Sequence, residues 1–140
     1  MRWYLVRHAQ TVWNQEDRIQ GHCDPPLSPL GEQQATCLAS HFASRTISAI
    51  VSSQLQRTRR TAQTIAQANG HRLIPSIEAD LAEIHLGTWE GLTPEEVDAR
   101  HGGAYRQWRI APSSLQIPGG EPVEAFRQRV RRATEKLRAT

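Results

Sequence analysis

The chain has 140 residues, of which 38% are hydrophobic and 22% charged, and its formal net charge at pH 7 is +3. A chain of this length forms one domain and buries about 70% of its unfolded surface. Because no long apolar run is present, we expect neither a transmembrane span nor a signal peptide, and we place the protein in the cytoplasm. Its two cysteines, Cys23 and Cys37, are too few for a disulfide framework and lack metal-ligand spacing.

The first expected element is a strand over residues 2–6, where the apolar run is continuous. Such a run predicts a strand that is buried on both faces of a parallel sheet, with Trp3 in the core. Arg7 and His8 follow directly, at the edge where open α/β sheets bind their ligands. A guanidinium there can hold a phosphate while an imidazole attacks its phosphorus. The same dipeptide also occurs in ordinary surface turns, so by itself it does not decide between the two interpretations.

The next segments alternate between helix and strand. Ser28 as N-cap and Pro29 at the first helical position predict a helix with an apolar stripe that ends near residue 44. Short strands are expected over residues 47–51 and 72–74, with a helix over residues 56–68 between them. This alternation predicts a layered α/β domain with parallel pairing.

The pattern becomes less regular between residues 75 and 120, where Gly, Pro, Trp and His accumulate. We interpret this stretch as a long, structured excursion, in which Trp13, Trp89 and Trp108 serve packing rather than substrate stacking. Thr93 begins a short helix within it, to about residue 100. A last amphipathic helix follows Pro122, and its many arginines are read as a solvated face rather than a nucleic-acid surface.

Further polar residues are expected at the same sheet edge as Arg7 and His8. Asn14, Gln20 and Gly21 lie on the loop after His8, where amides and a closely approaching backbone can reach phosphate oxygens. Arg57 begins the helix after the second strand and forms a second anion-facing location. Glu83 lies early in the excursion, although a loop acid of this kind is more often simply solvated.

Five ordered segments carry a family resemblance: LVRHAQTVWN, QGHCDPPLSPLGEQQA, SSQLQRTRRTAQTIA, LAEIHLGTWEGL and PGGEPVEAFRQR. They resemble the histidine phosphatase superfamily, also called the phosphoglycerate mutase-like family, and cover nearly the whole chain in the family's order. The resemblance implies a three-layer α/β/α sandwich with a mainly parallel central sheet. It also implies a small phosphorylated metabolite as substrate, with no cofactor and no metal, because arginines supply the positive charge.

The resemblance also assigns roles to individual residues. His8 would be the nucleophile that becomes phosphorylated, while Arg7 and Arg57 would hold the phosphoryl group. Glu83 would give a proton to the leaving oxygen and take one from the attacking water. The substrate pocket would be lined by Asn14, Gln20, Gly21, Thr11, His85 and Leu86.

The sequence departs from the family pattern in two ways. Ala9 stands where glycine is commoner, which is tolerable if the backbone there has a negative φ. The chain also stops at Thr140, before the strand that carries a second histidine in other members. We therefore expect residues 1–140 to be a single histidine phosphatase domain from a longer protein. Such a chain would be weakly active or inactive, and its open sheet would either self-associate or rely on a further segment.

Three functions remain open from the sequence. A phosphatase is favoured, because family mutases usually have a longer insert than the one between Glu90 and Gly119. The GTWEGLTPEEV stretch of the chain is similar both to broad-specificity phosphatases and to α-ribazole-phosphate phosphatases, and it does not distinguish between them. A mutase that returns the phosphoryl group to its product is the alternative enzyme. A catalytically inactive binding module is the third.

Overall fold

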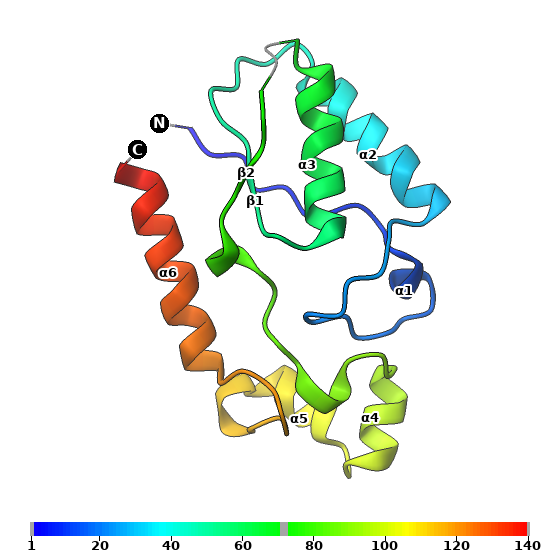
Figure 1. The fold of residues 1–140 in the computed structure, drawn as a ribbon. Helices are drawn as coiled ribbons and strands as arrows, with labels where there is room; N and C mark the ends of the chain where they lie inside the picture. Colours follow the sequence, from blue (N-terminus) through cyan, green and yellow to red (C-terminus); the bar gives the residue numbers. More distant parts are fainter. Residues whose placement is uncertain (1, 71–72, 140) are drawn as a thin grey trace.

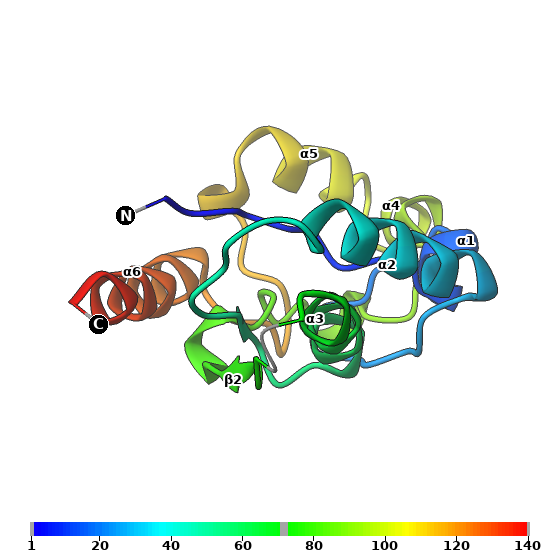
Figure 2. The same cartoon turned by 90° about the horizontal axis from the view of Figure 1, so that it is seen from above.

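A computed structural model describes residues 2–70 and 73–139 of the chain. Helices α2 (Pro29–Phe42) and α3 (Gln56–Ala68) pack against each other on one side of a small sheet, and α6 (Val123–Ala139) lies on the other side (Figure 1). Seen from above, α6 again lies on the opposite side of the strands from α2 and α3 (Figure 2). The molecule therefore has the layered α/β arrangement that the sequence predicts.

The sheet consists of β1 (Val51–Ser52) and β2 (Ser76–Ile77), which pair in parallel with Val51 opposite Ser76. The chain passes from β1 to β2 through α3, so the predicted strand–helix–strand unit with parallel pairing is confirmed. Both strands are shorter than expected and are shifted towards the C-terminus. Residues 47–50 are not in a strand, and neither are residues 73–74 of the expected third strand, whose Arg72 lies outside the described residues.

The strand expected over residues 2–6 is not formed. Leu5 is 92% exposed and Trp3 is 40% exposed, so the prediction of a core tryptophan is wrong as well. The physical reason is that a strand requires a neighbour for its N–H and C=O groups. Within residues 2–70 and 73–139, β1 pairs with β2 alone. Tyr4 instead packs edge-on against Phe42 at the end of α2, with ring centroids 5.4 Å apart.

The helices match their local signals. Ser28 accepts a hydrogen bond from the N–H of Gly31 through its side-chain oxygen, and Pro29 occupies the first turn of α2, as expected. That helix ends at Phe42, two residues before the predicted end. In contrast, α3 has the predicted bounds but no side-chain cap of its own. Its first N–H group, at Gln56, donates to Asp24 Oδ2 at 2.7 Å, so the cap comes from a distant loop.

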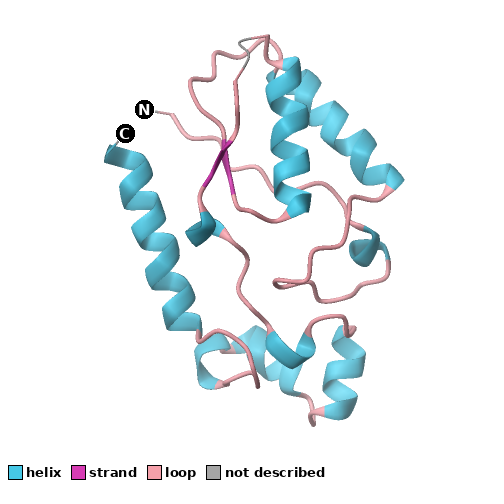
Figure 3. Ribbon diagram, viewed as in Figure 1, coloured by secondary structure: helices cyan, strands magenta, loops and turns pink. Residues whose placement is uncertain are grey.

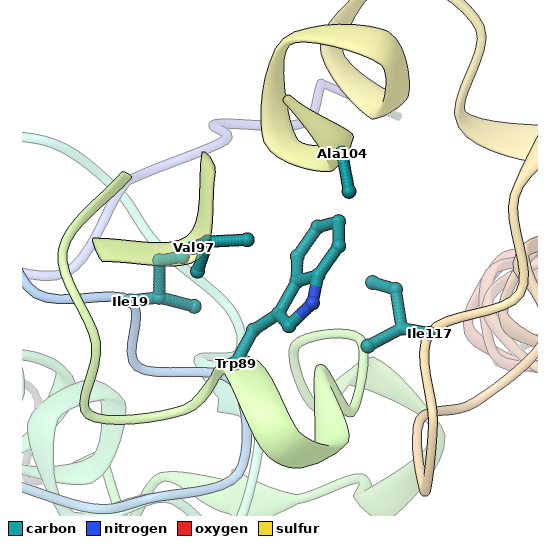
Figure 4. Packing of buried hydrophobic residues seen from close by; sticks show 5 residues of the cluster. All are labelled: Ile19, Trp89, Val97, Ala104 and Ile117. Atoms are coloured by element: carbon teal, nitrogen blue, oxygen red, sulfur yellow. The ribbon is translucent and has the colours of Figure 1, made fainter. Parts of the chain in front are cut away.

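The excursion after β2 is built of short helices and loops (Figure 3). Trp89, only 1% exposed, is the centre of its core and packs with Ile19, Val97, Ala104 and Ile117 (Figure 4). This confirms that Trp89 serves packing. The elements of this region are 3₁₀ turns η1 (Ala79–Leu81), η2 (Gly87–Trp89) and η3 (Pro112–Ser114) and helices α4 (Pro94–Arg100) and α5 (Ala104–Ile110).

Of the two helices in the excursion, the sequence predicts α4 but not α5. The predicted α4 has a capping box, in which Thr93 and Glu96 bond each other's backbone N–H groups. The sequence analysis missed α5, because its N-terminus lacks a capping side chain of its own. Asp98 on α4 supplies the cap by accepting from the N–H of Tyr105 at 2.8 Å. None of the described helices is both long and apolar enough to cross a membrane.

Candidate active site

His8 is held in one orientation and one tautomer. Its Nδ1 lies 2.8 Å from the carbonyl oxygen of Ala9. Because a carbonyl can only accept, Nδ1 must carry the hydrogen, and the neutral ring then has its lone pair on Nε2. Burial lowers the pKa of His8 below its ordinary value of 6.5, and the charges of Arg57 and Arg7 act in the same direction. The imidazole is therefore neutral at pH 7.

The backbone next to His8 is anchored to α3. The N–H of Ala9 donates to the hydroxyl of Thr61 at 3.1 Å, and that hydroxyl donates to the carbonyl of Arg57 at 2.8 Å. The methyl group of Ala9 is buried against Leu27 and Ala35. The φ of Ala9 is not positive, so alanine fits this position without strain, as the sequence analysis requires.

Arg57, in the first turn of α3, is 1% exposed. Its Nη2 donates to the carbonyl of Gly21 and its Nη1 to the carbonyl of Cys23, each at 2.8 Å, so the guanidinium is fixed against the loop that follows His8. Asp24 adds a carboxylate oxygen 3.8 Å from Nη1. Burial lowers the pKa of Arg57, but an arginine so close to a carboxylate keeps its charge.

Thr11 connects the two amide side chains of the loop. It is fully buried and caps α1 (Val12–Gln15), and its hydroxyl faces Asn14 Oδ1 at 3.1 Å and Gln20 Oε1 at 2.9 Å. The N–H of Thr11 also donates to Asn14 Oδ1. Both amide oxygens are therefore directed at Thr11, which leaves the NH₂ groups to donate elsewhere. Thr11 lies behind Asn14 and Gln20 and orients them.

Glu90 joins this loop to the excursion, and the sequence analysis did not identify it. Its side chain is 8% exposed, and its carboxylate accepts hydrogen bonds from the N–H groups of His22, Cys23 and Leu86 at 2.8, 3.0 and 2.9 Å. Burial alone would raise the pKa of Glu90, but these donors outweigh it and the pKa is lowered. Gly21 has a φ of +52°, and a side chain there would overlap the Glu90 carboxylate.

Glu83 lies on the exposed side of the same group of residues. Its charge acts on both His8 and Arg57, which places the three groups in one electrostatic neighbourhood. Glu83 Oε1 accepts from the N–H of Ile84 at 2.8 Å, and its carbonyl accepts from His22 Nε2 at 2.8 Å. The residue predicted as the acid is thus exposed, and it is held through its backbone carbonyl and through one carboxylate oxygen.

His85 and Leu86 differ in their surroundings. The His85 ring packs edge-on against the ring of His22, with centroids 4.8 Å apart, and its Nε2 is 3.8 Å from Glu90 Oε1. Leu86 is partly buried and packs against the Trp89 cluster. Both residues are half-buried.

Residues 3–140 match the family model of the histidine phosphatase superfamily, branch 1. The chain belongs to this superfamily. "Probable phosphoglycerate mutase GpmB" of Escherichia coli (strain K12 / DH10B) is 42% identical over 140 residues, which are 96% of this chain and 62% of that protein. The same figures hold for the protein of that name in Shigella boydii. The chain thus spans 62% of the length of these curated relatives.

Solved structures show the histidine phosphatase fold. A mycobacterial glucosyl-3-phosphoglycerate phosphatase, studied as complexes with VO3, matches with a TM-score of 0.86 and 36% identity over 95% of this chain and 65% of that one. The α-ribazole phosphatase of Shigella flexneri matches with a TM-score of 0.84 and 26% identity over 96% of this chain and 65% of that one. The fold of the chain is therefore α/β and phosphoglycerate mutase-like.

In this histidine phosphatase chain, the residues that the sequence analysis missed are those that hold others in place. Thr61, Glu90, His22 and Asp24 each bond a predicted site residue or the residue beside one. A weak signal existed for Glu90, since it directly precedes Gly91 in a Gly-rich stretch. Nothing in the local sequence indicates the partners of the other three, because those lie up to 61 residues away.

Proposed function

We propose that the chain is the His8-bearing part of a phosphomonoester hydrolase that works through a phosphohistidine intermediate. The observation that carries the proposal is the tautomer of His8, with Nδ1 bonded to the Ala9 carbonyl and a neutral ring at pH 7. An imidazole is a nucleophile only when neutral, and its lone pair must face the phosphorus. Burial supports a neutral ring, and the contact of Nδ1 with the Ala9 carbonyl leaves the Nε2 lone pair unprotonated.

In the first half-reaction, Nε2 attacks the phosphorus of a bound phosphomonoester. A bond forms from nitrogen to phosphorus, and the ester oxygen leaves with its electron pair. Glu83, when protonated, gives its proton to that oxygen, so an alcohol is released. Arg57 and Arg7 offset the charge on the phosphoryl oxygens, with Asn14 and Gln20 as further donors.

In the second half-reaction, the Glu83 carboxylate takes a proton from water, and the water oxygen attacks phosphorus. The nitrogen–phosphorus bond breaks and returns its electron pair to Nε2. The products are inorganic phosphate, a neutral His8 and a protonated Glu83, which restores the starting state. A mutase differs only in the acceptor, because a hydroxyl group of the bound product then takes the place of water.

Both reactions have support among the relatives. The 42% identical Escherichia coli protein carries a mutase name, whereas the matching mycobacterial and Shigella proteins carry phosphatase names. We favour hydrolysis because family mutases usually have a longer insert between Glu90 and Gly119. In this chain the stretch holds only the short helices α4 and α5 and the turn η3.

Rapid-quench labelling tests the proposal. The chain is mixed with a ³²P-labelled phosphomonoester and quenched in alkali, and label that is stable to base and lost in acid is expected on His8. His8→Ala should abolish it, whereas His101→Ala, a change at an exposed histidine on α4's C-terminal end, should retain it. Release of inorganic phosphate indicates a phosphatase, and transfer to a second hydroxyl of the product indicates a mutase. Labelling that persists in His8→Ala contradicts both, and no labelling of the unchanged chain favours a binding module.

A further inference from the structure

Arg129, on α6, uses every donor of its guanidinium. Nε and Nη2 hold the two carboxylate oxygens of Glu121 at 2.7 and 2.8 Å. Nη1 donates to the carbonyls of Asp80 and Ala82 at 2.8 and 2.7 Å, and the second hydrogen of Nη2 donates to the carbonyl of Glu83 at 2.9 Å. An arginine has five N–H groups, and all five are engaged here. The side chain is 12% exposed.

Three of these five hydrogen bonds are to carbonyl groups in one short stretch of backbone. The carbonyls of residues 80, 82 and 83 lie at and just after the end of η1, where a helical turn leaves carbonyl groups without an internal partner. The ion pair with Glu121, two residues before α6, would by itself tie Arg129 only to the start of its own helix. Arg129 instead fixes the peptide units that lead directly into Glu83.

Glu121 also contacts the backbone that follows Glu83. Its N–H donates to the carbonyl of His85 at 2.8 Å, and its Oε2 lies 3.4 Å from the N–H of His85. The Arg129–Glu121 pair therefore holds the chain both before and after Glu83. His22 adds a third contact, from the loop that follows His8, by donating to the Glu83 carbonyl.

We propose that Arg129, oriented by Glu121, is a positioning residue that sets where Glu83 stands relative to His8. This inference rests on the proposed function, in which Glu83 transfers the proton. All five donors of Arg129 are engaged by Glu121 and by backbone carbonyls, which leaves none for a phosphoryl group or a leaving oxygen, so Arg129 acts through the backbone of Glu83. A displacement of about 1 Å at a reacting group costs about 100-fold in rate, so such a device has a measurable effect.

Arg132 provides the matched control. It is one helical turn further along α6 and faces the same residue, Asp80, but through the Asp80 side chain at 3.6 Å. Its own side chain is 63% exposed. Arg132→Met therefore removes an arginine from the same helix and the same partner without touching the carbonyls before Glu83.

The first test measures the pKa of His8 by NMR titration and needs no turnover. The negative charge of Glu83 raises this pKa, so Glu83→Gln lowers it. If Arg129 positions Glu83, Arg129→Met lowers the His8 pKa by a similar amount, and the double variant lowers it no further. The loss of a nearby positive charge would act in the opposite direction. An unchanged or raised His8 pKa in Arg129→Met, or additive effects in the double variant, would overturn the inference.

Arg129→Lys is the second variant, for the case in which Arg129→Met does not fold. It keeps the positive charge but has three donors instead of five, so a smaller lowering of the His8 pKa is expected. Urea unfolding establishes that each variant is folded before it is titrated. Arg132→Met should leave the His8 pKa unchanged, and a lowering as large as that of Arg129→Met would show a general effect of α6.

The second test compares two leaving groups. Phenyl phosphate needs protonation of its leaving oxygen, whereas p-nitrophenyl phosphate needs much less. Arg129→Met should slow phosphorylation of His8 by phenyl phosphate about 10- to 100-fold and by p-nitrophenyl phosphate far less, with inorganic phosphate affinity retained. An equal loss with both substrates contradicts the positioning role. If the unchanged chain forms no phosphohistidine, the proposed function fails, while the titration still decides the position of Glu83.

Discussion

The hydroxyl of Thr61 accepts a hydrogen bond, at 3.1 Å, from the N–H of Ala9, the residue directly after His8. Both residues are buried, Thr61 at 3% exposed and Ala9 at 4%. Since Thr61 also bonds the carbonyl of Arg57, one side chain connects the predicted nucleophile to the helix turn that carries the predicted phosphate-binding arginine. The relative position of the two groups therefore depends on this contact.

Thr61→Val keeps the shape of this side chain and removes the acceptor. The N–H of Ala9 is then buried without its partner, and we expect the free energy of unfolding to fall by about 1–3 kcal/mol in urea titrations. Hydrogen exchange at the Ala9 amide should accelerate. Thr61→Ser keeps the hydroxyl and should retain the slow exchange at this amide. Equal protection of that amide in both variants would contradict the role given to Thr61.

The stability of the protein should depend on pH through His8. Its pKa is lowered in the folded state, so the unfolded chain takes up a proton at higher pH than the folded one. As the pH falls below about 6.5, the unfolded state gains protons first and the folded state loses stability, until the folded pKa is passed. His8→Gln should lack this loss. The check is the urea midpoint of both proteins between pH 8 and pH 5, and parallel curves would show that the pKa of His8 is not lowered.

Gly21→Ala should be much more costly than Gly102→Ala. Both glycines have a positive φ, of +52° and +59°. Apart from Gly102 itself and its two chain neighbours, no heavy atom of the described residues lies within 4 Å of a Cβ at Gly102, whereas a Cβ at Gly21 would overlap the Glu90 carboxylate. Thermal or urea unfolding should give a loss of about 1–2 kcal/mol for Gly102→Ala and about 2–5 kcal/mol for Gly21→Ala, in which overpacking is added. Similar losses would mean that Glu90 moves aside freely.

Glu83→Gln should slow phosphorylation of His8 by phenyl phosphate about 10²- to 10⁴-fold, which is the usual contribution of a positioned acid or base. The affinity for inorganic phosphate should be retained, because the amide keeps the size of the side chain. Glu95→Gln, at an exposed acid in the first turn of α4, is the control and should change neither quantity. A loss of phosphate affinity with an unchanged rate would make Glu83 a binding residue.

Local signals account for the elements that the sequence predicted well. The bounds of α3 at Gln56 and Ala68 match the apolar spacing and the Asn69–Gly70 stop, and Thr93 with Glu96 marks the start of α4. Each of these signals acts between residues at most a few positions apart. The resemblance to the family also depends on short segments, and the family model match over residues 3–140 confirms it.

The sequence by itself determined the family, the helices with their own caps and the identity of the candidate site residues. Only the tertiary structure decided that residues 2–6 lack a strand partner within the described chain, that Asp98 caps α5, and that Asp24 caps α3. It also decided which nitrogen of His8 carries the hydrogen, and that Arg129 and Glu90 hold the loops of the site. The physical reason is the same throughout. A hydrogen-bond donor is specified by its own residue type, but the acceptor it meets is specified by the fold.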